Sequence, residues 1–158
     1  MRGPGVSALA MENHKELDVW KKSVALTTEL YALTSRFPDA ERYGLASQIR
    51  RAATSIAANI AEGWGRGSTA EYIQFLTVSR GSLMELETHL IVARNLSFLK
   101  PDEFAAVSRE VENIGKMLNR LISVLRGRKR ERAPETEPRT PKPESRTPNP
   151  EPRTPRFA

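Results

Sequence analysis

Residues 43–63 read YGLASQIRRAATSIAANIAEG, and this stretch indicates the fold most directly. Successive residues of an α-helix are rotated by roughly 100°, so side chains three and four apart share a face. The core-facing stripe expected of a packed helix consists of Leu45, Ile49, Ala52, Ile56 and Ile60. Beside it runs a strip of small residues, Ala46, Ala53, Ala57 and Ala61. Small side chains predict tight packing against another helix, and Gly63 is expected to end this one.

The remaining face of this stretch is polar, with Gln48, Arg51, Ser55, Asn59 and Glu62 at helical spacing. These residues fit either a hydrogen-bonded network that fixes the helix register or a binding surface, and the sequence leaves both interpretations open. Arg50 and Arg51 point about 100° apart, so we expect the two arginines to have different roles.

Three further segments, residues 16–35, 68–96 and 101–126, have apolar residues at alternating steps of three and four. Ser68 followed by Glu71 is a capping box, and Pro101 suits the first turn of a helix. The short glycine-rich linker at 64–68 requires antiparallel neighbours. The sequence therefore predicts an all-α fold, an antiparallel up-down four-helix bundle with a disordered C-terminal tail.

Residues 16–35 carry two apolar stripes, although a helix in a monomeric bundle needs only one. The first stripe, at heptad spacing, consists of Leu17, Trp20, Val24, Thr27, Tyr31 and Thr34. We expect the second stripe to face another subunit, and the candidate interface residues are Leu26, Leu30, Leu33, Met117 and Val124. Gly81, in the middle of a helix, is expected to mark a close crossing with the alanine strip.

Charge and composition divide the chain into a flexible N-terminus (1–15), the bundle (16–126) and a disordered basic tail (127–158). The net charge is +6, yet residues 11–126 hold 15 basic and 14 acidic residues, whereas residues 127–158 hold 9 and 5. The tail repeats a seven-residue Pro-Thr-Arg-Glu pattern. It is interpreted either as translated tandem-repeat DNA or as a flexible arm that contacts phosphates or a partner. Met11 is an alternative start.

No catalytic, metal or membrane motif is recognisable. The chain lacks cysteine, which fits a reducing cytoplasm, and it has no apolar run of the roughly 20 residues that a membrane span needs. It has no phosphate loop, dinucleotide fingerprint or nucleophile elbow, and its two histidines, His14 and His89, do not form the paired Glu-x-x-His motifs of a di-iron bundle. We therefore expect a protein without enzymatic activity, cofactor or metal.

Basic residues provide the candidate nucleic-acid contacts. They are Lys21, Lys22, Arg50, Arg51, Arg66, Arg80, Arg94, Arg128, Lys129 and Arg130. No aromatic pair of the RNA-recognition type and no helix-turn-helix accompanies them, so recognition of specific bases is not predicted.

Three motifs carry a resemblance to a known family: QIRRAATSIAANIAEG at 48–63, FPDAERYGL at 37–45 and GSLMELETHL at 81–90. They resemble the 23S rRNA-intervening sequence proteins, bacterial four-helix bundles similar to the accessory variability determinant of diversity-generating retroelements. The resemblance implies a ring-like homo-oligomer, a homopentamer in the retroelement relatives, which binds nucleic acid and associates with a reverse transcriptase. The relatives' barrel is basic, whereas residues 11–126 are nearly neutral.

The function predicted from the sequence is thus a non-enzymatic oligomeric adaptor for RNA or DNA, and for a reverse transcriptase. The alternative is a structural or protein-interaction bundle of the same family with no nucleic-acid role.

Overall fold

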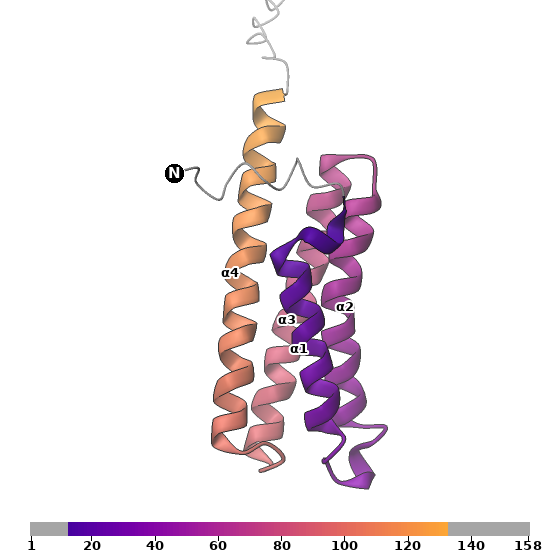
Figure 1. Ribbon diagram of the computed structural model, residues 1–158, viewed down its shortest axis with the longest axis vertical. Coiled ribbons are helices and arrows are strands. Elements are labelled where there is room, and N and C mark those ends of the chain that lie inside the picture. Colours follow the sequence, from indigo (N-terminus) through magenta and orange to yellow (C-terminus); the bar gives the residue numbers. More distant parts are fainter. Residues whose placement is uncertain (1–12, 133–158) are drawn as a thin grey trace, which may run out of the picture.

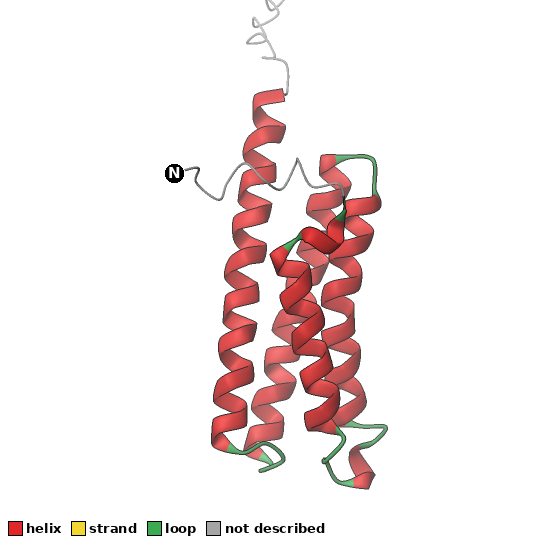
Figure 2. Cartoon of the chain, viewed as in Figure 1, coloured by secondary structure: helices red, strands yellow, loops and turns green. Residues whose placement is uncertain are grey.

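The computed structural model describes residues 13–132, in which four α-helices run antiparallel. They are α1 (Asp18–Thr34), α2 (Leu45–Gly65), α3 (Thr69–Asn95) and α4 (Pro101–Arg132). Each helix packs against two others, so that α1 lies diagonally across the bundle from α3 (Figure 1). The described range contains helices and loops but no strand (Figure 2). This confirms the all-α bundle, while the predicted flexible N-terminus and disordered tail fall mostly outside the described residues.

Short connections hold the helices antiparallel. One-turn 3₁₀ helices precede α1 (His14–Glu16) and lie between α1 and α2 (Asp39–Glu41). Between α2 and α3 the N-cap bond of the predicted capping box is confirmed, because the Ser68 hydroxyl accepts a hydrogen bond from the Glu71 N–H at 3.2 Å. The same hydroxyl donates to the Glu71 carboxylate at 2.8 Å. These bonds satisfy a free N–H at the start of α3 and fix where that helix begins.

A single hydrophobic core runs the length of the bundle. Its largest fully buried side chains include Leu30, Ile49, Ile56, Ile60, Leu76, Leu86, Leu90, Ile114 and Leu118. The predicted apolar stripe of α2 lies in this core except for Leu45, which is partly buried. Ala46 and Ala53 from the alanine strip are also buried. The strip faces α1, since Ala46 lines a hollow with Thr34 while Ala57 and Ala61 line another with Trp20. The most extensive helix pair in the bundle, α2 with α3, is formed by a different face of α2.

The orientation of α1 differs from the prediction. Leu26 and Leu30, assigned to a subunit interface, are buried within the single chain, and Leu33 packs against the core. Val24 and Tyr31 of the other stripe are exposed instead. The interface prediction for Leu26 and Leu30 is therefore wrong, because these side chains have no surface left to offer a neighbour. Of the two remaining candidates, Met117 packs against the core and Val124 is half-buried.

Two hydroxyl groups are buried on α1 beside these leucines. Ser23 and Thr34 are buried on α1, and each donates to the carbonyl oxygen four residues earlier, at 2.7 Å and 2.6 Å. Buried polar groups are tolerated when they are hydrogen-bonded, so these residues can accompany Leu26 and Leu30 into the core.

The two mid-helix glycines also behave differently from the prediction. Gly63 does not end α2, which continues to Gly65. A Cβ at position 63 would lie 2.7 Å from the Phe75 Cβ, so glycine is required there by the close approach of α3. Gly81 has no other atom within 4 Å of where its Cβ would be, and it is exposed rather than packed on the alanine strip.

Helix α4 is longer than predicted. It passes the expected boundary at Arg126 and is helical through Arg132, the last residue that the structure describes, so residues 127–132 continue α4. Arginine and lysine have good helix propensity, and the single Gly127 costs only about 1 kcal/mol, less than is needed to stop a helix anchored by its packed turns.

Candidate functional site: basic surfaces and uncharged faces of the bundle

The C-terminal end of α4 concentrates positive charge. We call Arg126, Arg128, Lys129, Arg130 and Arg132 the α4 basic end. All five are exposed except Arg128, which is half-buried, and α4 extends beyond its neighbouring helices here (Figure 1). With these residues included, residues 13–132 hold 19 basic and 14 acidic side chains, a balance of +5. The folded part is therefore more basic than we expected from the sequence, which placed the end of the bundle at Arg126.

A hollow of about 330 Å³ lies between α3 and the α4 basic end. Its lining includes Arg80, Arg126 and Arg130, and Arg80 donates a hydrogen bond to Asn119 at 3.1 Å. The structure thus brings together two predicted contacts, Arg80 and Arg130, and adds Arg126. Sequence reasoning missed Arg126 because it was taken as the last residue of the helix; its spacing of four from Arg130 places both on one face once the helix continues.

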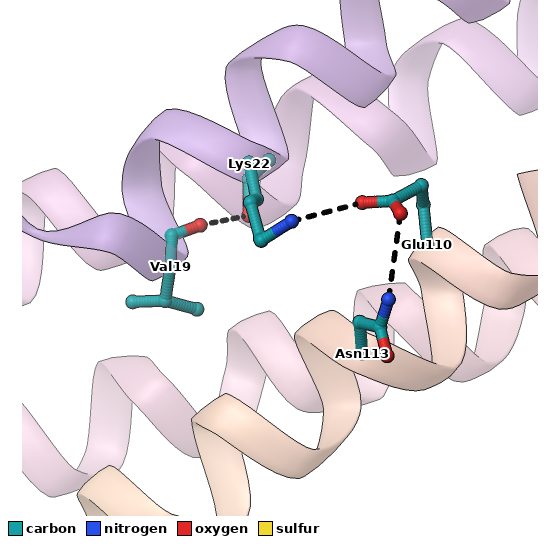
Figure 3. Close-up of polar contacts among 5 residues, drawn as sticks. Val19, Lys22, Glu110 and Asn113 are labelled. Atoms are coloured by element: carbon teal, nitrogen blue, oxygen red, sulfur yellow. Dashed lines mark hydrogen bonds and ion pairs between the residues drawn. The ribbon is translucent and has the colours of Figure 1, made fainter.

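Several predicted phosphate contacts are engaged in local interactions instead. The Lys22 ammonium lies 3.4 Å from the Glu110 carboxylate, which also accepts a hydrogen bond from Asn113 (Figure 3). Lys22 therefore links α1 to α4, and both Lys21 and Lys22 are exposed. Exposed ion pairs contribute about 0–1 kcal/mol, so Lys22 could exchange its partner at little cost.

Arg66 and Arg94 both rest on aromatic rings. Arg66 pairs with Glu62 and lies over the ring of Phe75 at 4.9 Å. Arg94 lies over the ring of Phe104 at 4.5 Å. Stacking of this kind covers the ring and orients the guanidinium, which indicates a packing role for both arginines.

A larger hollow, of about 710 Å³, opens on α2 beside α1 and α3. We call it the Tyr–Arg groove, after the lining residues Tyr31, Arg42, Tyr43, Arg50 and Arg51. Arg50 is held by a 2.9 Å hydrogen bond from its Nε to the Thr34 hydroxyl, and it stacks on Tyr31 at 4.7 Å. Arg51 is exposed at the rim. The two arginines thus have different roles, as their angular separation indicated.

Hydroxyl groups lie beneath this groove. The Ser55 and Ser82 hydroxyls are 2.9 Å apart, joining α2 to α3, and the Asn59 amide donates to the Ser55 carbonyl oxygen at 2.8 Å. The polar stripe of α2 is therefore divided between the two interpretations. Ser55 and Asn59 form a network within the bundle, whereas Arg51 remains on a surface.

Two uncharged surfaces remain uncovered by the chain. The first is a hollow of about 330 Å³ between α1 and α2, whose lining includes Trp20, Val24, Ala57 and Ala61. We call it the α1–α2 apolar groove, and it adjoins the Tyr–Arg groove because Thr54 and Ala58 line both. The second is the outer face of α3, where the large exposed apolar side chains are Met84, Ile91 and Val92; Val78 lies at its edge, in line with Glu85.

Neither a metal cluster nor a membrane span is found within residues 13–132. No three His, Asp or Glu side chains of this range are arranged to hold a metal ion. None of its helices has the length and apolar character to cross a bilayer.

Comparison with known proteins agrees with the fold. Residues 15–120 match the family model described as 23S rRNA-intervening sequence protein. A similar solved structure is that of a protein of unknown function from the S23 ribosomal protein family of Bacteroides thetaiotaomicron. It is 24% identical, with a TM-score of 0.63 over 66% of this chain and 95% of the other. No curated protein matches the chain. The family match spans most of the bundle, so this protein belongs to the 23S rRNA-intervening sequence protein family.

Proposed function

We propose that the protein is a non-enzymatic scaffold that binds nucleic acid through the phosphates. The observation that carries this proposal is the α4 basic end, which continues a folded helix and, with Arg80, presents several cations beside one hollow. A rigid array of guanidinium groups suits the phosphate backbone, because arginine presents several donors in a fixed geometry. Phosphate contacts of this kind carry no sequence information, so binding is expected to be insensitive to base sequence.

The scaffold is proposed to assemble from several copies. The α1–α2 apolar groove and the outer α3 face are two different surfaces of the bundle, because α1 makes no contact with α3. If one face of each copy packs on the other face of the next, the contact is head-to-tail, and such contacts close into rings when the rotation permits. Gly81 on α3 is exposed, and no atom of the same chain lies close enough to require a glycine there. The glycine therefore supports the close approach of a second copy at this position.

The alternative function is a protein-interaction bundle without a nucleic-acid role, which the same two uncharged faces support. Association with a reverse transcriptase stays a prediction from the family resemblance. A pull-down between this protein and a reverse transcriptase encoded beside its gene would test it.

Removal of charge from the α4 basic end tests the main proposal. The variant carries Arg126→Gln, Lys129→Gln and Arg130→Gln in the full chain. Its matched control, Lys15→Gln, Lys100→Gln and Arg109→Gln, removes the same charge from exposed positions elsewhere. We expect the variant to lose at least tenfold in affinity for duplex DNA at low salt, and the control to lose much less. Equal losses in both would show that net charge, not this site, governs binding.

A further inference from the structure

We infer that the Tyr–Arg groove holds unpaired bases of the bound nucleic acid. This inference rests on the proposed nucleic-acid function and adds a preference for single strands. It starts from Tyr43, whose side chain is 88% exposed although tyrosine usually buries most of its ring. The ring contributes little to the core, so its placement in the loop before α2 needs another explanation.

The second aromatic ring of the groove is fixed in place. Tyr31 is 47% exposed, and Arg50 stacks on it at 4.7 Å while donating to Thr34. Because Thr34 in turn donates to the Leu30 carbonyl oxygen, Arg50 is tied to the backbone of α1. Arg50 covers one face of this ring, and the part of the ring that stays exposed is a preorganised stacking surface, which reduces the entropy lost on binding.

Positive charge lies beside both rings. Arg42 is 6.0 Å from the centre of the Tyr43 ring, and Arg51 lines the same groove with an exposed side chain. Aromatic rings interleaved with cations are the pattern by which proteins bind single strands, the rings stacking on bases and the cations contacting phosphates. Duplex bases are already stacked and could not use the rings.

An acidic peptide is a weaker match for this groove. Such a peptide would use the arginines, yet it would leave the largely exposed Tyr43 ring without a flat partner. Glu85 also lines the groove; its carboxylate repels an acidic side chain and a phosphate alike, but it can accept hydrogen bonds from the amino group of a base, which an acidic peptide does not offer. The observations therefore favour a nucleic acid.

The test compares Tyr43→Ala with Tyr43→Phe in the full chain. The probes are a labelled single-stranded RNA of about 20 nucleotides and the matching duplex, with affinity measured by fluorescence anisotropy. We expect Tyr43→Ala to weaken single-strand binding about tenfold, with duplex binding unchanged, because one stacked base is lost. Tyr43→Phe keeps the ring and should bind as the wild type does. Both variants should fold, since the side chain lies on the surface.

The outcomes separate this inference from the proposed function. Tyr43 belongs to the connection between α1 and α2, and this connection lies at the opposite end of the bundle from the C-terminal end of α4 (Figure 1). If Tyr43→Ala binds both probes as the wild type does while the α4 charge variant binds neither, the inference is wrong and the proposed function stands. If the wild type binds neither probe at low salt, both are wrong. A third outcome would assign the groove to a protein partner. In that case single strands bind the wild type and Tyr43→Ala equally, whereas an oligoglutamate peptide binds the wild type but not Tyr43→Ala.

Discussion

At the scale of single residues, Tyr72 is the least satisfied group in the described part of the chain. Its hydroxyl is buried without a hydrogen-bond partner, and its ring packs edge-on against Trp64 with centroids 6.0 Å apart. Burial disfavours the charged phenolate and raises the pKa of Tyr72 to about 12. The hydroxyl is therefore a cost that the packing of the ring offsets.

Tyr72→Phe is predicted to leave the free energy of unfolding unchanged or to raise it by about 1 kcal/mol, because it removes an unpaired buried polar group. The wild type should lose stability as the pH rises from 10.0, the ordinary tyrosine value, towards about 12, since only the unfolded chain readily loses the proton. The phenylalanine variant should lack that loss. Urea unfolding at neutral and alkaline pH measures both effects.

Tyr72→Ala provides the control, and it should destabilise the protein by about 3 kcal/mol or more through loss of the ring. A clear loss of stability in Tyr72→Phe at neutral pH would mean that the hydroxyl has a partner, for example a bound water molecule, and would contradict this account.

At the scale of helices, the two glycines form a matched pair. Gly63→Ala places a methyl group 2.7 Å from the Phe75 Cβ and 2.9 Å from a ring carbon of Tyr72. We expect it to destabilise the α2–α3 contact by about 1–3 kcal/mol. Gly81→Ala meets no atom and should stabilise the isolated chain by about 0.5–1 kcal/mol. Thermal unfolding of both variants would check these opposite signs, and a stabilising Gly63→Ala would contradict the close contact.

The choice of the buried stripe on α1 shows what periodicity could and could not predict. The positions and faces of α2 and α3 followed from one clear apolar stripe in each. On α1, two stripes are apolar, and the packed bundle buries Leu26 and Leu30 together with Ser23, whose hydroxyl donates to a carbonyl oxygen of the same helix. That is a property of the packed state, so the sequence predicted the limits of this helix to within two residues but assigned the wrong face to the core.

The candidate site was predictable only in part, for a similar reason. Arg80 and Arg130 could be identified as basic residues, but their proximity depends on the continuation of α4 past Gly127. The Tyr–Arg groove was missed because Tyr31 and Tyr43 lie on either side of the turn between α1 and α2. Their gathering with Arg50 and Arg51 is a consequence of tertiary packing rather than of a local motif.

At the scale of the whole molecule, two different uncharged faces predict a head-to-tail assembly. Val24→Glu alters the α1–α2 apolar groove, and Met84→Glu alters the outer α3 face. Both side chains are exposed, so each variant should fold. Each alone should be monomeric, because one face of every contact carries a charge. An equimolar mixture should form heterodimers, since one intact face remains on each partner.

Light scattering of the separate variants and of their mixture measures this assembly. An interface that uses the same face on both copies would give no heterodimer in the mixture. A wild-type protein that is monomeric at all concentrations would contradict the proposed assembly altogether.

The salt dependence of nucleic-acid affinity tests the central claim most directly. The logarithm of the binding constant for duplex DNA falls linearly with the logarithm of salt concentration, with a slope of about 0.9 for each phosphate contacted. We predict that the Arg126→Gln, Lys129→Gln and Arg130→Gln variant has a slope smaller by about 2–3 than the wild type, and that the Lys15→Gln, Lys100→Gln and Arg109→Gln control keeps the wild-type slope. An unchanged slope in the α4 variant would contradict the assignment of phosphate binding to the end of this helix.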